Sequence, residues 1–82
     1  MNADTDVNKY IHFTENTPPG LKTRVFECHN NRSGAILGLV KWYGPWRQYC
    51  FFTEAAIFNA DCLKYIGGFL NIMNALHKHG KS

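Results

Sequence analysis

The longest periodic pattern of apolar positions lies between Asn59 and His79. Apolar residues there recur at steps of three and four, the spacing that places side chains on one face of an α-helix. They are Cys62, Leu63, Ile66, Phe69, Leu70, Met73 and Leu76. Asn59 suits the N-cap, and Gly80 follows a basic last turn at the position expected just beyond a helix end. The pattern therefore predicts a helix over 59–79.

Two adjacent glycines, Gly67 and Gly68, stand in the middle of this helical pattern. Each disfavours the helix by about 1 kcal/mol relative to alanine. The missing side chains must therefore bring some advantage. Three explanations are open: close approach to a bulky strand residue, contact with the helix of a second copy, or a kink.

The rest of the chain carries shorter apolar runs of the kind that form β-strands. We expect strands near 10–13, 23–29, 35–43 and 46–52, separated by segments rich in Pro, Gly and Asn. The predicted fold class is α+β, an antiparallel β-meander of three to four strands packed on one C-terminal helix. Residues 1–8 are polar and are expected to form a flexible N-terminal tail, so that 9–82 make a single domain.

Gly44-Pro45 is the strongest hairpin signal in the chain. A two-residue loop would pair Tyr43 with Trp46 and Trp42 with Arg47, whereas a longer loop would shift this register. One face of the sheet is more aliphatic, and we expect the helix to cover it: Phe26, Cys28, Leu37, Leu39, Cys50 and Phe52. The exposed face would then carry Val25, Ile36, Val40, Trp42, Arg47, Tyr49 and Phe51. If the helix covers the second face instead, the exposed set becomes Lys41, Tyr43, Trp46 and Gln48.

No sequence motif for catalysis is present, and the six acidic residues are scattered without an obvious pair. Cys28 and His29 are neighbours on a predicted strand, so their side chains point to opposite faces and cannot work as nucleophile and base. Cys28, Cys50 and Cys62 form no CxxC pattern and are expected to be buried, reduced thiols that bind no metal. We therefore expect no enzyme and no cofactor. His77 and His79 are interpreted as a solvated helix end.

The net charge of +3 is spread along the chain and forms no concentrated basic patch. The first residues are polar, and no apolar stretch approaches the length of a membrane span. These patterns favour a cytoplasmic protein with no membrane partner.

The segment 41–52, KWYGPWRQYCFF, concentrates aromatic and basic residues. It supplies the candidate binding residues: Lys41, Trp42, Tyr43, Trp46, Arg47, Tyr49 and Phe51. One hypothesis is an interaction surface for a partner protein or for a second copy in a homodimer. The alternative is weak binding of single-stranded nucleic acid, with bases stacked on the rings and Arg47 near phosphate, because alternating Arg47, Tyr49 and Phe51 resemble a strand of an RNA-recognition motif.

The segment 38–52, GLVKWYGPWRQYCFF, follows KTRVFEC and precedes IFNADCL. Together these stretches resemble a set of small uncharacterised proteins from bacterial and phage or prophage genomes, over most of the chain. The resemblance implies a phage-type accessory protein, for example one that inhibits a host protein or defence complex by occupying its surface. It carries over no activity and no site residue.

Overall fold

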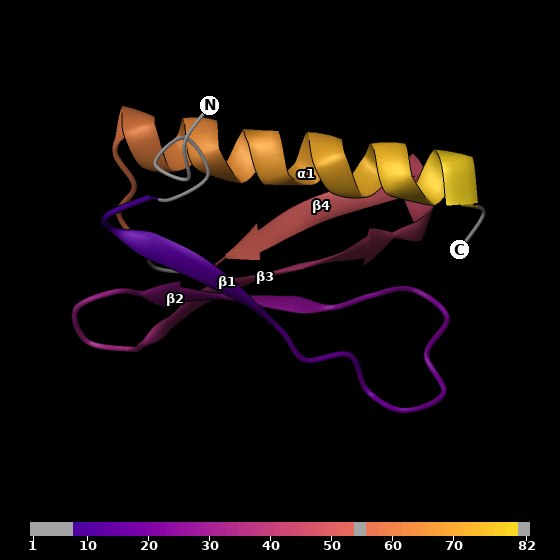
Figure 1. The fold of residues 1–82 in the computed structure, drawn as a ribbon, viewed down its shortest axis with the longest axis horizontal. Helices are drawn as coiled ribbons and strands as arrows, with labels where there is room; N and C mark the ends of the chain where they lie inside the picture. Colours follow the sequence, from indigo (N-terminus) through magenta and orange to yellow (C-terminus); the bar gives the residue numbers. More distant parts are fainter. Residues whose placement is uncertain (1–7, 54–55, 81–82) are drawn as a thin grey trace.

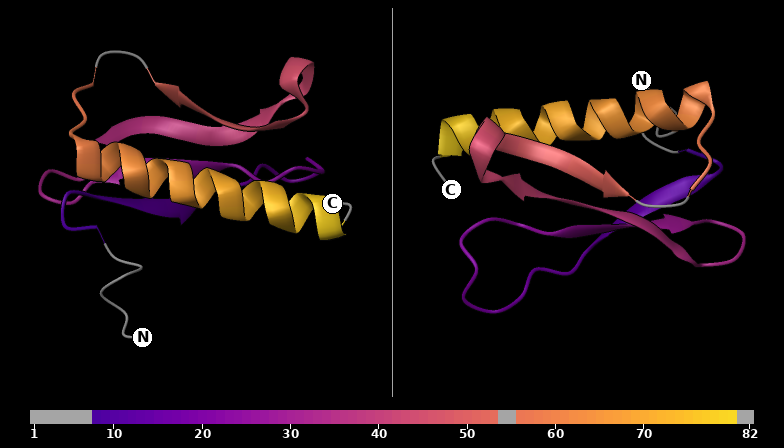
Figure 2. Two further views of the ribbon diagram at one scale, coloured as in Figure 1. Left: turned by 90° about the horizontal axis from the view of Figure 1, so that it is seen from above. Right: turned by 180° about the vertical axis from the view of Figure 1, so that it is seen from behind.

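The computed structural model describes residues 8–53 and 56–80. Its elements are β1 (Ile11–Glu15), β2 (Phe26–Asn30), β3 (Ile36–Tyr43), the 3-10 turn η2 (Gly44–Trp46), β4 (Gln48–Thr53) and α1 (Ala60–Gly80). The strands form one antiparallel sheet in the order β1-β2-β3-β4. Helix α1 lies along one face of this sheet (Figures 1 and 2). The predicted α+β meander with one C-terminal helix is confirmed.

The start of β1 is tied to the start of α1 by Asn8. Its Oδ1 accepts hydrogen bonds from the backbone N–H of Tyr10 at 2.8 Å and of Ile11 at 3.1 Å, and its Nδ2 donates to the carbonyl of Asp61 at 3.5 Å. Asn8 was the last residue of the predicted tail. The remainder of that prediction, residues 1–7, lies outside the described residues.

Helix α1 begins as the sequence predicts. The N–H of Cys62 donates to Asn59 Oδ1 at 2.8 Å, which satisfies one of the free donors of the first turn. The helix ends at Gly80, one residue later than expected. It passes Gly67 and Gly68 without a break or sharp bend (Figure 1).

The helix covers the face opposite to the one we expected. From the sheet, the buried core residues are Ile11, Phe26, Cys28, Val40 and Tyr49; from the helix they are Cys62, Ile66 and Met73. The prediction placed Phe26, Cys28 and Leu37 on the helix side correctly, since Leu37 packs against the core that contains Cys28, Cys62 and Ile66. It was wrong to group them with Leu39 and Phe52, because Val40 and Tyr49 are the β3 and β4 side chains that share their core.

A β-bulge explains this error. His29 pairs with Ile36, but the register then shifts, so that Cys28 pairs with Gly38 rather than with Leu37. Without the extra residue, Cys28 would face Leu37, and the set of side chains that we predicted would lie on one side. A shift of one residue moves a strand's side chains to the other face of the sheet. The bulge therefore decides which face of β3 joins the core.

The β3–β4 hairpin has a longer loop than Gly44-Pro45 alone. Its ladder pairs Tyr43 with Gln48 and Trp42 with Tyr49, two residues away from the predicted register. The loop is η2 followed by Arg47, which has a φ of 53° in the left-handed region. A shift of two residues keeps each side chain on its predicted face of the hairpin, so only the pairing changes.

Aromatic rings fill the space between α1 and the sheet. Phe69 of α1 stacks on Phe13 with a centroid distance of 4.2 Å and meets Phe26 edge-on at 5.0 Å. Gly38 leaves room for the ring of Phe51, because a Cβ there would lie 2.7 Å from Cζ of Phe51 and 2.6 Å from the carbonyl oxygen of Phe52. The glycine at this strand position is therefore a packing requirement.

Candidate functional site

Three of the candidate binding residues lie beneath α1. Tyr49 is 3% exposed, and its hydroxyl accepts a hydrogen bond from the N–H of Arg24 at 3.0 Å. Trp42 packs edge-on against Tyr49, and Trp42 and Phe51 are half-buried in the same cluster. The expected exposed face of Trp42, Tyr49 and Phe51 is therefore wrong, and with it the stacking platform that the nucleic-acid alternative required.

His77 belongs to this packed region and not to a solvated helix end. Its ring lies 4.2 Å from that of Trp42 and 5.9 Å from that of Tyr49, measured between centroids. Its Nδ1 is buried and has no hydrogen-bond partner among the residues that the structure describes. His79, in contrast, is exposed as expected.

The other candidates gather on the sheet face opposite α1, here called the outer face. Tyr43 meets Trp46 edge-on at 5.2 Å and Phe52 at 5.7 Å, and the ammonium of Lys41 lies 4.8 Å from the centroid of Phe52. Trp46 is 66% exposed. We call Lys41, Tyr43, Trp46 and Phe52 the outer aromatic cluster. Arg47 is exposed beside it, at the end of the loop.

Phe52 is the member of this cluster that the sequence interpretation placed beneath the helix. Its ladder partner is Leu39, and both side chains lie on the outer face. The alternation along β4 could have found it, since Phe52 shares its side with Gln48 and Cys50. Phe52 was misplaced only because the helix was expected to cover this face of the sheet.

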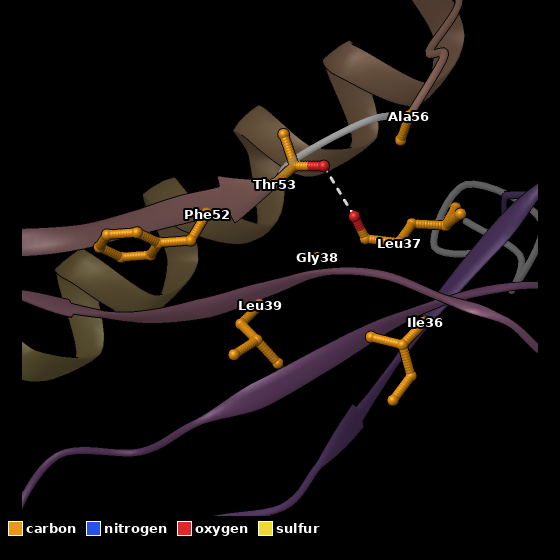
Figure 3. Close-up of a pocket in the computed structure, with 7 residues that line it drawn as sticks. All are labelled: Ile36, Leu37, Gly38, Leu39, Phe52, Thr53 and Ala56. Atoms are coloured by element: carbon orange, nitrogen blue, oxygen red, sulfur yellow. Dashed lines mark hydrogen bonds between the residues drawn. The ribbon is translucent and has the colours of Figure 1, made fainter.

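A hollow of about 570 Å³ adjoins the cluster on this side of the molecule. Its lining residues are Ile36, Leu37, Gly38, Leu39, Phe52, Thr53 and Ala56. Figure 3 shows Ile36 and Leu39 pointing to the same side of β3, while the hydroxyl of Thr53 donates to the carbonyl of Leu37 at 2.7 Å. Ile36 is 56% exposed. Phe52 lines the hollow and belongs to the cluster, so the two adjoin each other.

Polar side chains occupy the outer face at the β1–β2 side. The rings of His12 and His29 stack at 5.2 Å, and His12 Nδ1 contacts Asn31 Oδ1. His29 Nε2 lies 3.0 Å from Glu27 Oε1. The outer face therefore has an aromatic and apolar half on β3 and β4 and a polar half on β1 and β2.

The cysteines are all free thiols, but only two are buried. Burial beneath α1, with a smaller contribution from neighbouring Cys62, raises the pKa of Cys28 to about 11, which keeps the thiol protonated and unreactive at neutral pH. Cys50 is partly exposed on the outer face, contrary to the expectation of three buried thiols.

Neither a metal site nor a membrane-spanning segment is found in the described part of the chain. Across residues 8–53 and 56–80, no three His, Cys, Asp or Glu side chains are grouped so that they would hold a metal ion. Within the same ranges, no helix has both the length and the apolar character needed to span a bilayer.

The chain is similar to a phage protein. It shares 35% identical residues over 69 positions with the uncharacterized 9.3 kDa protein of Acholeplasma phage L2, and the aligned region covers 83% of this chain and 88% of that protein. Comparisons with protein-family models and with solved structures give no match. With this identity over nearly the full length of the relative, the chain belongs to the same family as the phage L2 protein.

Proposed function

We propose that this chain is a non-enzymatic binding module that acts by docking its outer face onto a partner protein. The supporting observation is the outer aromatic cluster with its exposed Trp46, together with the hollow that it adjoins at Phe52. Monomeric proteins rarely expose large contiguous apolar patches, and tryptophan and tyrosine are the residues most enriched at the energetic centres of interfaces.

The composition of this surface favours a protein partner. Trp46 projects a large, mostly exposed ring at the hairpin end, and Tyr43 holds it by an edge-on contact. Beside Phe52 the hollow offers room for an apolar side chain of the partner. The ammonium of Lys41 lies over the Phe52 ring and supplies a cation within this surface. A large exposed ring and a recess beside it are features of many protein interfaces.

A phage setting fits this mode of action. The family includes a phage protein, and a chain of this size can alter a larger protein by occupying its surface. The buried, protonated thiol of Cys28 is unsuited to act as a nucleophile. We therefore propose a host protein as the target, with inhibition as the consequence.

The test compares the native chain with Trp46→Ala and with the control Leu21→Ala, which also removes an exposed apolar side chain but from the β1–β2 loop. Each variant is immobilised and exposed to a bacterial host lysate, and retained proteins are identified by mass spectrometry. A protein retained by the native chain and by Leu21→Ala, and lost with Trp46→Ala, supports the proposal. Identical retained proteins for all three chains would refute it.

The salt dependence of the affinity distinguishes weak nucleic-acid binding from binding of a partner protein. Phosphate contacts release counterions, so that affinity falls steeply as salt increases, whereas an apolar protein interface is much less sensitive. Quenching of tryptophan fluorescence by oligonucleotides, present at low salt and lost at high salt, would favour nucleic acid over the protein partner proposed here.

A further inference from the structure

Strand β1 borders the sheet on the side away from β4, and one of its edges has no neighbouring strand (Figure 2). The N–H of Asn16, just beyond the strand, donates to the carbonyl of Val25 at 2.8 Å. Because backbone groups alternate in direction along a strand, the even-numbered residues of β1 turn theirs toward β2. The odd-numbered residues turn theirs toward the open edge: Ile11, Phe13 and Glu15.

Side chains cover one end of this open edge. At Ile11, Oδ1 of Asn8 accepts a hydrogen bond from the N–H at 3.1 Å, and Nδ2 of Asn31 donates to the carbonyl at 3.4 Å. The backbone groups of Phe13 and Glu15 have no such partner among residues 8–53 and 56–80. Two N–H and two carbonyl groups are therefore free to pair with a further strand.

These free groups are complementary to those of a second copy. If two β1 strands meet antiparallel, with Thr14 opposite Thr14 of the second copy, Phe13 lies opposite Glu15 of the other chain in both directions. Each of these pairs exchanges two hydrogen bonds, so every free group finds a partner. The register is centred on a twofold axis, the relation that an interface between identical chains requires. Glu15 faces an aromatic ring there, and its charge is already paired with Arg24.

The flank of α1 beside this edge is also apolar. Tyr65 and Phe69 stack on Phe13, which identifies the flank that faces β1. Ile72 and Leu76 lie on the same flank, three and seven residues after Phe69, and are 58% and 53% exposed. Opposed residues of an antiparallel pair point to the same side of a sheet, so both helices would lie on one side of the joined sheet. The two apolar flanks would then face each other across the axis.

The glycines of α1 are not required by packing within the described fold. A Cβ added at Gly67 or Gly68 would meet no atom within 4 Å, so close approach to a bulky strand residue, one of the explanations offered by the sequence, is wrong. Gly68 stands one turn before Ile72 and belongs to the same flank. The absent side chain leaves room there for a second copy. Nothing in the described fold explains Gly67.

We propose that two copies of this chain associate edge to edge through β1, with Phe13 of each copy paired with Glu15 of the other, and so form one continuous sheet. The paired segment is short, so the dimer is weak and forms at concentrations on the order of 100 μM. The outer aromatic cluster lies on the face of the joined sheet that carries no helix. Dimer formation and docking of a partner protein therefore use different surfaces.

Cross-linking at the axis tests the register. Opposed Cα atoms in a pair that exchanges no hydrogen bonds are about 4.5 Å apart, within the range of a disulfide. Thr14→Cys should therefore form a covalent dimer under mild oxidation, in a Cys50→Ser background because Cys50 is the partly exposed native thiol. Asn16→Cys in the same background is the matched control, since Asn16 is exposed on the same face but lies four residues, roughly 13 Å along the strands, from its copy. We expect cross-linking at least about tenfold slower for the control.

Sedimentation equilibrium of Glu15→Pro and Glu15→Gln tests the backbone pairing. Proline removes the N–H at the open edge and breaks no hydrogen bond to β2. Glutamine keeps the N–H, and both variants lose the same ion pair to Arg24. We expect a dimer about tenfold weaker for Glu15→Pro than for Glu15→Gln, because two hydrogen bonds are lost per dimer. Circular dichroism of dilute samples establishes that both variants are folded, and if Glu15→Pro does not fold, the cross-linking comparison decides.

Three results would overturn the proposal. One is a native chain that stays monomeric up to about 1 mM, well above the concentrations at which this dimer would form. Another is equal cross-linking of Thr14→Cys and Asn16→Cys. The third is a dimer that Trp46→Ala abolishes and Glu15→Pro leaves unchanged, which would place the second copy on the outer face.

Discussion

The side-chain amide of Asn74 on α1 forms hydrogen bonds with both backbone polar groups of Tyr49 on β4. Its Oδ1 accepts a hydrogen bond from the Tyr49 N–H at 2.6 Å, and its Nδ2 donates to the Tyr49 carbonyl at 3.5 Å. β4 is an edge strand, so these two groups have no neighbouring strand to pair with. The amide takes the place of that strand and fixes the helix against the sheet edge.

Asn74→Ala should lower the free energy of unfolding by about 1 to 2 kcal/mol, because it leaves partly buried backbone groups without partners. Urea denaturation at low protein concentration measures the loss. Asn71→Ala is the matched control, since Asn71 is exposed on the same helix. It should change stability little, in the stabilising direction of alanine's helix propensity. Equal losses for both variants would argue that the hydrogen bonds between Asn74 and the Tyr49 backbone do not stabilise the fold.

The helix and the alternation of side chains along each strand could be predicted, because both depend on local sequence patterns. Asn59 caps α1 as expected, and Phe26 and Cys28 face the helix as the alternation in β2 predicts. The covered face of β3 was not predictable by the same means, because both of its faces carry large apolar residues. The deciding feature is a one-residue bulge at Leu37, a long-range pairing detail that leaves no periodic signal.

Which candidate residues are exposed depends on the face of the sheet that the helix covers. Because Val40 and Tyr49 are in the core, Trp42 and Phe51, two residues further along their strands, lie on the same face. Lys41 and Tyr43 alternate with them and lie on the outer face. One signal did favour the correct face. A glycine at position 38 marks close packing on the side that it shares with Val40 and the Phe51 ring.

Gly38→Ala should destabilise the fold by about 1 to 3 kcal/mol, the usual range for a methyl group forced into a packed site. Its Cβ would meet the backbone oxygen of Phe52, which cannot move aside as a flexible side chain would. Gly68→Ala adds the same methyl group in open space and should instead stabilise by up to about 1 kcal/mol. Thermal unfolding of the two variants at low concentration gives the comparison. Similar melting temperatures would contradict the packing described for β3.

Stability should decrease in acid through Glu15. Hydrogen bonds from Arg24 and then Thr17 lower the pKa of this carboxyl from 4.5 to about 2. Since the folded pKa lies below the unfolded one, the stabilisation is complete above about pH 4.5 and is lost as the pH falls toward 2. Hydrogen bonds from Asn16 and then His29 lower the pKa of Glu27 as well, and add to the same trend.

Urea titrations between about pH 6 and pH 2 follow this loss. Glu15→Gln and Arg24→Gln should each flatten the pH dependence over this range, because either change removes the same ion pair. A variant with the same slope as the native chain would show that another carboxyl dominates the acid sensitivity.

The three thiols should differ in reactivity. Cys50 is partly exposed on the outer face and should react first with a small alkylating reagent in the native protein. Cys28 and Cys62 are buried, and the raised pKa of Cys28 further lowers its thiolate fraction at neutral pH. Mass spectrometry of the timed reaction assigns each site. Early modification of Cys28 would mean that α1 does not cover this face as described.

Trp46→Ala separates docking through the outer face from folding, because stability and partner retention are measured on the same protein. Trp46 is mostly exposed and contacts Tyr43, so we expect a loss of unfolding free energy of at most about 1.5 kcal/mol, short of the roughly 3 to 5 of a buried aromatic ring. Retention of the partner protein should be lost. A loss of about 3 kcal/mol or more, or unchanged retention by the folded variant, would show that Trp46 is not an exposed anchor for a partner protein.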